Sequence, residues 1–348
     1  MNEFLKPSRL RAGDTVAIVS PSWGGPSAFP HIYEAGVRQL EDTFGLKVKE
    51  YPTARMDADE VYNNPKLRAK DINDAFADPE VKAIFATIGG DDSVRLLPYL
   101  DQTLIKKNPK IVMGYSDTTT LLTCCNQLGL VTFHGPTIMA GFSQIPSFPQ
   151  TFVEHIKSMF FACPETYEYN SYDTYSEGYP DWGKVENVGL IKNKHPKEDW
   201  HWVQGKTVVQ GPLFGGCIEV LQYFLNGTAF WPDQDFWNGK ILFLETSEEH
   251  PPISVVRYTL RGLAMQGVFD RISGLAFGRA RDYSLEEKTH LDKAIVTIVT
   301  KEFGHPELPI LTNLDFGHTD PQWIIPLGVK AEIDCINKRF HLIERACI

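Results

Sequence analysis

The chain has 348 residues, more than one hydrophobic core usually supports, so we expect two domains. Hydrophobic residues make up 43% and charged residues 22%, as in ordinary globular proteins, and the formal net charge of −10 argues against a nucleic-acid or anionic-membrane partner. Neither a signal-type N-terminus nor a run of 18 apolar residues occurs, so we expect a cytoplasmic protein without a membrane span.

The first half alternates short apolar runs with segments of helical period. The expected strands are residues 15–20, 47–51, 81–88, 110–114 and 131–134, and the expected helices are 30–44, 64–77, 93–100 and 118–128. Strands that alternate with helices are typical of a parallel sheet covered on both faces. We therefore expect an N-terminal domain of this α/β type.

The pattern lapses between about 163 and 204, and so long a stretch is usually a linker or a functional loop. Regular signals resume afterwards. Strands are expected near 206–209, 240–245, 272–278, 309–311, 323–325 and 330–335, and helices near 253–266 and 284–303. The predicted organisation is an N-terminal domain over 1–165, a linker and substrate loop over 166–205, and a second α/β domain over 206–348.

Ser116 is the sharpest candidate for chemistry. It follows the strand at 110–114 and leads into a helix, so its hydroxyl is expected at an exposed turn beside the positive end of that helix. A serine in this position is also a common helix cap, and the segment alone leaves both interpretations open. The spacing is not G-x-S-x-G, which disfavours an ordinary α/β-hydrolase.

Gly89 and Gly90 follow the neighbouring strand, where glycines let the backbone approach a ligand and direct N–H groups at it. Gly90 is a candidate oxyanion donor, and Asp91 beside it is a candidate substrate contact. A plain tight turn is the alternative. The segment lacks the glycine spacing of nucleotide-binding loops, and the six cysteines lack C-x-x-C spacing, so we expect neither a cofactor nor a metal.

A carboxylate and two histidines complete the candidates. Glu245 ends a strand that reads as buried, where an unpaired carboxylate is unfavourable, so a histidine, an arginine or a helix start should bind it. His318 lies in a glycine-containing loop without apolar periodicity, whereas His134 follows a strand and either rivals His318 or lines the pocket. A serine, a histidine and a carboxylate are the nucleophile, the base and the orienting group of a catalytic triad.

Across nearly its whole length the sequence resembles the LD-carboxypeptidases and their relatives, the microcin C immunity proteins. The resemblance rests on Arg9–Pro21, Gly89-Gly90, Leu96–Asp101, Gly114–Asp117, Phe133–Pro136, Gly211–Gly216, Leu242–Glu245 and Gly317-His318. It implies a flavodoxin-like N-terminal domain, a swivelling-type C-terminal α/β domain, a site between them, no metal or cofactor, and commonly a homodimer.

The same resemblance implies roles for individual residues. Ser116 would be the nucleophile, His318 the base and Glu245 its carboxylate partner, while backbone N–H groups of Gly90 and Asp117 would hold the oxyanion. The long segment before residue 205 is similar to the microcin-immunity branch.

Several further side chains are candidates for binding substrate. Trp200 and Trp202 would stack on a nucleobase, unless they only pack the loop. Arg279 or Arg281 would hold a substrate carboxylate.

Three functions stay open at this point. The first is a serine-type peptidase that cleaves the amide between a peptidyl or aminoacyl group and a nucleotide. The second is a muramoyl-tetrapeptide LD-carboxypeptidase of cell-wall recycling. The third is a two-domain binding protein without catalysis, in which Ser116 only caps a helix.

Overall fold

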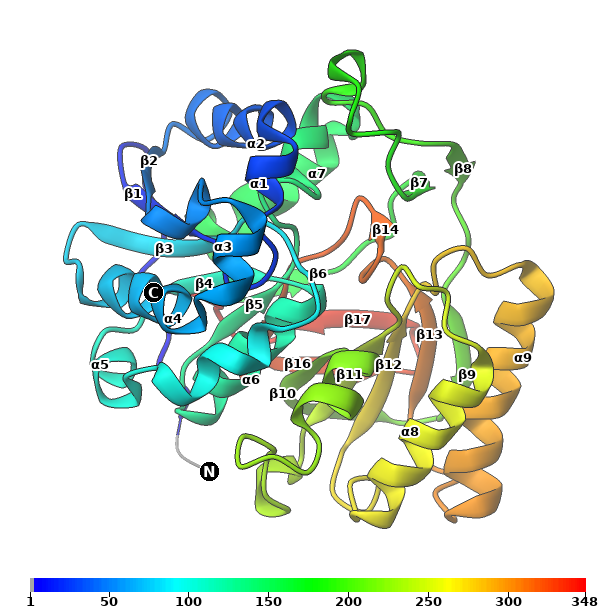
Figure 1. Ribbon diagram of the computed structural model, residues 1–348. Coiled ribbons are helices and arrows are strands. Elements are labelled where there is room, and N and C mark those ends of the chain that lie inside the picture. Colours follow the sequence, from blue (N-terminus) through cyan, green and yellow to red (C-terminus); the bar gives the residue numbers. More distant parts are fainter. Residues whose placement is uncertain (1–2) are drawn as a thin grey trace.

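The computed structural model describes residues 3–348 and places two large sheets side by side (Figure 1). The first sheet has the order β15-β5-β4-β3-β1-β2. Its strands are β1 (Thr15–Val19), β2 (Lys47–Glu50), β3 (Val81–Ala86), β4 (Ile111–Gly114), β5 (Thr132–His134) and β15 (Ile325–Leu327). β1 to β5 are parallel in the flavodoxin order 2-1-3-4-5, which confirms the expected N-terminal fold.

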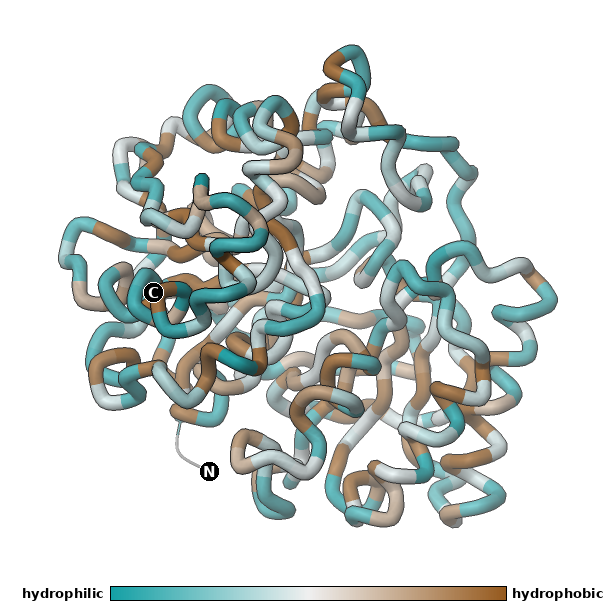
Figure 2. The backbone as a smooth tube through the Cα atoms, viewed as in Figure 1, coloured by the Kyte–Doolittle hydropathy of each residue, from teal (hydrophilic) through white to brown (hydrophobic). Residues whose placement is uncertain are grey.

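Helices cover both faces of this sheet, as the alternating sequence pattern predicts. They are α1 (Gly25–Ala28), α2 (Pro30–Asp42), α3 (Ala58–Asn63), α4 (Pro65–Ala77), α5 (Gln102–Lys107), α6 (Thr119–Gln127) and α7 (Gln150–Lys157). The predicted helix at 93–100 is a 3-10 helix over Ser93–Tyr99 that contains Pro98, which cannot supply an N–H to an α-helical ladder. Hydrophobic residues, brown in Figure 2, gather along the strands between these helices.

The second sheet has the order β6-β17-β16-β10-β11-β12-β13-β9. Its strands are β6 (Tyr167–Glu168), β9 (His201–Gln204), β10 (Val208–Cys217), β11 (Ile241–Glu245), β12 (Gly274–Gly278), β13 (Ile310–Leu314), β16 (Lys330–Asp334) and β17 (Arg339–Leu342). Its middle strands β10 to β13 are parallel, and α8 (Ile253–Met265) and α9 (Leu285–Val296) lie against them (Figure 1). The predicted second α/β domain with a β-rich end is confirmed.

The segment 166–205 is more regular than its sequence indicated. Besides β6 and β9 it contains β7 (Thr174–Glu177) and β8 (Lys194–Pro196), which form a small sheet with β14 (Thr319–Asp320). These strands have at most four residues and their partners are mostly far along the chain, so no local period reveals them. The strand pairing makes much of the predicted linker part of the C-terminal half.

The two halves also exchange contacts. β15, from the C-terminal half, pairs antiparallel with β5 at the edge of the first sheet. A Cβ on Gly216, at the end of β10, would lie 2.5 Å from Thr119 Cγ2, so α6 of the first half packs directly on β10 of the second. The halves therefore meet where β4 leads into α6.

No helix in the described residues is both long and apolar enough to span a bilayer. Within residues 3–348, the six cysteines are free thiols, and no group of three His, Cys, Asp or Glu side chains is placed to hold a metal ion.

Candidate active site

A cavity of about 670 Å³ opens at the carboxyl ends of the first sheet's strands. In the order 2-1-3-4-5 the connections leave β1 and β3 in opposite directions, and ligands bind in the crevice formed there. The loops after these strands supply Ser22, Trp23 and the segment 88–92 to the cavity wall. The C-terminal half supplies Glu248, Glu249, Arg281 and His318. Both halves therefore enclose the same space.

Ser116 lines this cavity from the turn between β4 and α6. Tyr115 is extended, whereas Ser116 has φ +56°, a left-handed conformation that a non-glycine residue adopts at an energetic cost. Strained turns of this kind hold nucleophiles above the end of a strand in other hydrolases. The turn exposes the Ser116 hydroxyl to the cavity beside the N-terminal end of α6.

Asp117 fixes the loops around Ser116. Its buried carboxylate accepts hydrogen bonds from Ser22 Oγ at 2.5 Å, from the Asp92 N–H at 3.0 Å and from the Ser93 N–H at 2.8 Å. Burial raises the carboxyl pKa, and the hydrogen bonds from Ser22 and Ser93, which favour the ionised form, offset that rise only in part. One side chain thus ties the loops after β1 and β3 to the serine turn.

The two glycines of the loop after β3 permit a close approach of its backbone. A Cβ on Gly89 would lie 3.0 Å from Ser116 Oγ and 3.6 Å from the Asp117 nitrogen, and one on Gly90 (φ +152°) would lie 2.2 Å from Ser22 Oγ. Gly90 and Asp117, the predicted oxyanion donors, therefore belong to two turns that meet at Ser116.

Glu245 and His318 are joined by a hydrogen bond. Glu245 is the last residue of β11 and is fully buried, and its Oε2 lies 2.7 Å from His318 Nδ1. Gly317 makes room for this contact, because a Cβ there would lie 2.8 Å from Glu245 Oε2. Burial raises the Glu245 pKa, and the positive His318 opposes that rise.

Glu248 is a neighbour of His318 that sequence analysis did not single out. Its Oε2 lies 2.9 Å from His318 Nε2, the ring nitrogen on the side opposite Glu245, although the pair is not aligned as a hydrogen bond. Burial disfavours a charge on His318, but Glu245 and Glu248 together outweigh it and raise the imidazole pKa to about 10. The ion pair with His318 in turn lowers the Glu248 pKa to about 2.

His134 lies behind Glu245 and does not line the cavity. Its buried Nε2 is 3.9 Å from Glu245 Oε1, and its ring packs edge-on against Phe243 and Tyr115. Burial, with the nearby positive charge of His318, lowers the His134 pKa to about 3, so this ring is neutral. Asp91, in contrast, lines the cavity.

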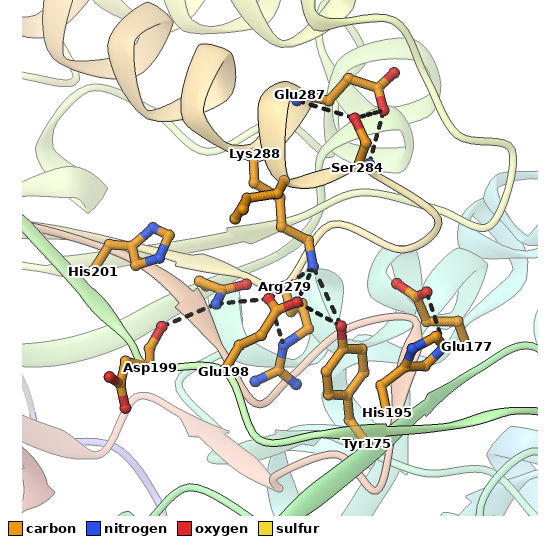
Figure 3. A network of polar contacts seen from close by, with 12 residues as sticks. Tyr175, Glu177, His195, Glu198, Asp199, His201, Arg279, Ser284, Glu287 and Lys288 are labelled. Atoms are coloured by element: carbon orange, nitrogen blue, oxygen red, sulfur yellow. Dashed lines mark hydrogen bonds and ion pairs between the residues drawn. The ribbon is translucent and has the colours of Figure 1, made fainter.

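Trp200, Trp202 and Arg279 lie outside the cavity. Trp200 donates its indole N–H to Asp315 Oδ2 at 2.7 Å, and the buried Arg279 donates to Asp315 Oδ1 at 3.0 Å. Trp202 pairs with Leu311 where β9 joins β13, beside a separate surface groove. Figure 3 shows Arg279 within a polar network with Glu198 and Tyr175. None of the three side chains lines the cavity that contains Ser116, where their predicted substrate-binding roles would place them.

Other aromatic side chains line the cavity instead. They are Trp23, Phe29, Tyr62, Tyr115, Tyr179 and Trp182. Tyr179 and Trp182 lie with ring centroids 5.0 Å apart, and Trp182 packs edge-on against Phe29 at 5.8 Å. Tyr179 and Trp182 both come from the irregular part of segment 166–205. The sequence shows many aromatic residues there, but without a regular period it does not predict which side chains face the cavity.

Two family models match the chain. The N-terminal domain of the LD-carboxypeptidases matches residues 16–135, and their C-terminal domain matches residues 210–333. A putative carboxypeptidase of Vibrio cholerae is 32% identical and covers 98% of each chain. The microcin C7 self-immunity protein MccF of Escherichia coli is 30% identical over 97% of this chain and 95% of its own. A probable murein peptide carboxypeptidase of Bacillus subtilis is 28% identical over 96% of this chain and 92% of its own.

Solved structures agree with these matches. MccF in complex with aspartyl sulfamoyl adenosine has a TM-score of 0.86 at 29% identity and covers 99% of this chain and all of its own. An MccF-like protein from Streptococcus pneumoniae in complex with AMP has a TM-score of 0.84 at 29% identity over 95% and 98% of the two chains. The protein thus belongs to the LD-carboxypeptidase family of serine peptidases, as its sequence motifs indicated.

Proposed function

We propose that the protein is a serine peptidase in which Ser116 is the nucleophile, His318 the general base and Glu245 the carboxylate that orients His318. The observation that carries the proposal is the buried Glu245–His318 hydrogen bond of 2.7 Å at the wall of a cavity that also exposes the Ser116 hydroxyl. A carboxylate on Nδ1 fixes the imidazole with Nε2 directed away from it, toward the cavity.

The reaction proceeds in two steps, acylation of Ser116 and hydrolysis of the acyl-enzyme. His318 takes the Ser116 proton as the oxygen attacks the substrate carbonyl, then returns it to the leaving nitrogen, so the amide bond breaks as an acyl ester forms. Water, deprotonated by His318, hydrolyses the ester and restores Ser116. The N–H groups of Gly90 and Asp117 hold the oxyanion, and loss of one such donor typically costs about 2.7–4 kcal/mol of transition-state stabilisation.

For the substrate we propose an aminoacyl or peptidyl group linked by an amide to a nucleotide-like moiety. The aromatic side chains of the cavity, Trp182 and Tyr179 among them, support this choice because aromatic rings stack on nucleobases. Relatives of similar fold bind AMP and aspartyl sulfamoyl adenosine.

A muramoyl tetrapeptide is the second candidate substrate. Arg281 supports it, since this cation lines the cavity and a guanidinium suits the terminal carboxylate of a peptide. A murein peptide carboxypeptidase is also among the relatives.

Parallel turnover assays test the proposal. An aminoacyl sulfamoyl adenosine and a muramoyl tetrapeptide ending in D-alanine are incubated with the wild type and with Ser116→Ala, and products are followed by mass spectrometry. We expect cleavage of the adenosine compound and a loss on the order of 10⁶-fold in the variant, as for other serine triads. Cleavage of the tetrapeptide alone would move the protein to the second substrate.

A serine-directed phosphonate separates both enzymes from a protein that only binds. We expect it to label Ser116, and a folded sample that stays unlabelled would contradict the triad.

The proposal also includes a homodimer and a cytoplasmic location, both on the basis of family membership. Light scattering and cell fractionation check them.

A further inference from the structure

A fully buried arginine lies behind the loops that form the cavity wall. Arg68 belongs to α4, and its side chain is 0% exposed. Removing a guanidinium group from water is unfavourable unless its N–H groups find acceptors inside the protein. The contacts of Arg68 therefore indicate what the buried charge stabilises.

The guanidinium group of Arg68 bonds two separate loops. It donates to both carboxylate oxygens of Asp92, in the loop after β3, at 2.7 and 2.9 Å. It also donates to the backbone carbonyls of Pro21 and Ser22, in the loop after β1, at 3.1 and 3.3 Å. One side chain thus fastens both loops to α4.

Gly90 lies between two of the contacts that join these loops. Residues 88–92 belong to no helix or strand, so side chains and single backbone hydrogen bonds must hold the segment. On one side of Gly90, the Gly89 carbonyl accepts a hydrogen bond from the Trp23 N–H at 3.2 Å. On the other side, two positions further on, Asp92 is bound by Arg68. The position of the Gly90 N–H depends on both contacts.

The same two loops are also held from the serine turn. Ser22 Oγ and the Asp92 N–H donate to Asp117 Oδ2, at 2.5 and 3.0 Å. Arg68 binds the carbonyl of Ser22 and the side chain of Asp92, whereas Asp117 binds the side chain of Ser22 and the N–H of Asp92. Together these contacts fix the distance between the Gly90 loop and the turn that carries Ser116.

An oxyanion hole stabilises a transition state only if its N–H groups already point at the site where the charge develops. A displacement of about 1 Å can lower the rate by about a hundredfold, even when its cause lies far from the reacting atoms. The loop that carries Gly90 has no regular structure of its own, so its anchors decide how accurately the N–H group is placed.

We propose, on the basis of the proposed function, that Arg68 is a positioning residue of the oxyanion hole. It holds the loops after β1 and β3 so that the Gly90 N–H keeps its place relative to Ser116 and Asp117. Arg68 acts from behind the cavity wall, through Asp92 and the loop backbone. It therefore contributes to stabilisation of the tetrahedral intermediate and not to binding of the substrate.

Arg68→Lys tests the proposal, because lysine keeps the positive charge but lacks the planar fork that bonds several acceptors at once. With whichever proposed substrate the wild type cleaves, we expect kcat to fall by about tenfold or more and KM to stay within about twofold. Labelling by the serine-directed phosphonate, whose phosphoryl oxygen occupies the oxyanion position, should slow by a similar factor. Thermal unfolding establishes that the variant is folded at the assay temperature.

Two further variants sharpen this test. Arg55→Lys is the matched control, since Arg55 binds both oxygens of Glu50 on the surface with its side chain 48% exposed, and it should leave kcat, KM and the labelling rate unchanged. Asp92→Asn weakens the same buried pair from its other side and should reproduce the loss in kcat. The double variant of Arg68 and Asp92 should lose little more than either single variant, because both changes remove one interaction.

Hydrogen exchange separates this inference from the proposed function. We expect the amides of residues 88–93 to exchange about tenfold faster or more in Arg68→Lys than in the wild type, with no change in Arg55→Lys. If the wild type cleaves nothing and stays unlabelled but this difference is found, the anchoring by Arg68 stands and the proposed function falls. If folded Arg68→Lys keeps the wild-type exchange rates, or an active enzyme keeps its kcat and loses only KM, the inference about Arg68 falls.

Discussion

At the level of single residues, the charge of His318 is set by its surroundings. Charged and titratable groups face it from several elements: Glu245 at the end of β11, Glu248 in the following loop, His134 from β5, Tyr115 from the serine turn and Asp320 from β14. The two glutamates dominate and raise its pKa to about 10. In the free enzyme at neutral pH, the imidazole is therefore protonated.

The pH profile of kcat/KM reports the base of the free enzyme. A base with a raised pKa is inactive below that pKa, so we expect kcat/KM to increase with pH through the neutral range without reaching a plateau. Glu248→Gln removes one of the two raising carboxylates, so the midpoint should move to lower pH. Glu186→Gln changes an exposed carboxylate that does not line the cavity, and as the control it should keep the wild-type profile. A midpoint that Glu248→Gln does not move would mean that Glu248 leaves His318 unperturbed in solution.

Asp117 allows a second prediction at this scale. In Asp117→Asn the carbonyl oxygen can take the place of Oδ2, which accepts all three hydrogen bonds, but the NH₂ group then takes the place of the buried, unpartnered Oδ1 and loses the hydrogen bonds that it makes to water in the unfolded chain. Such a loss costs about 1–3 kcal/mol of unfolding free energy, and displacement of the serine turn should also lower kcat. Urea unfolding measures the first effect. Asp74→Asn, in an exposed pair with Lys70, is the control and should change stability by about 0.5 kcal/mol or less.

At the level of elements, the segment that carries Tyr179 and Trp182 is anchored by a polar network (Figure 3). Lys288 of α9 is buried and binds both oxygens of Glu198, at 3.0 and 2.8 Å. Tyr175 on β7 also donates to Glu198, at 2.7 Å. Burial disfavours the Glu198 charge, but these partners outweigh it and lower its pKa to about 2. The network joins the segment to α9.

Lys288→Met tests whether this anchoring positions the aromatic wall. We expect an increase in KM of about tenfold with kcat nearly unchanged, because the variant loosens Tyr179 and Trp182 but leaves Ser116 and His318 in place. Lys293→Met, farther along α9 and outside the network, should leave KM unchanged. A decrease in kcat with KM unchanged would instead mean that the network positions the reacting groups rather than the aromatic wall.

Sequence and structure agree best where local patterns decide the element. The apolar runs of the first half become β1 to β5, and the ends of β4 and β11 bear Ser116 and Glu245, since strand ends can be located from periodicity. Trp200 and Arg279 were expected in the pocket, but a position along a strand does not tell which partner the side chain meets. Glu248 was not predicted as a site residue because its role depends on His318. The two residues are seventy positions apart in the sequence and come into contact only in the folded chain.

At the level of the whole molecule, the two halves are not independent units. β15 covers the outer edge of β5, so a fragment of residues 1–165 would expose that edge and the part of α6 that packs on β10. We expect the fragment to aggregate or to lack a cooperative transition, because uncovered strand edges associate. Circular dichroism and light scattering check this against the full chain. A monomeric fragment with a sharp unfolding transition would contradict it.

The distribution of the proposed triad over both halves also affects biosynthesis. Ser116 lies in the turn after β4 of the first sheet, whereas Glu245 ends β11 and His318 lies in the loop after β13 of the second, and β15 completes the first sheet later still. During translation the proposed nucleophile Ser116 is synthesised before the proposed base His318, so a growing chain carries the serine without the group that would activate it. With the triad as proposed, hydrolytic competence arises only after both sheets have closed around the cavity.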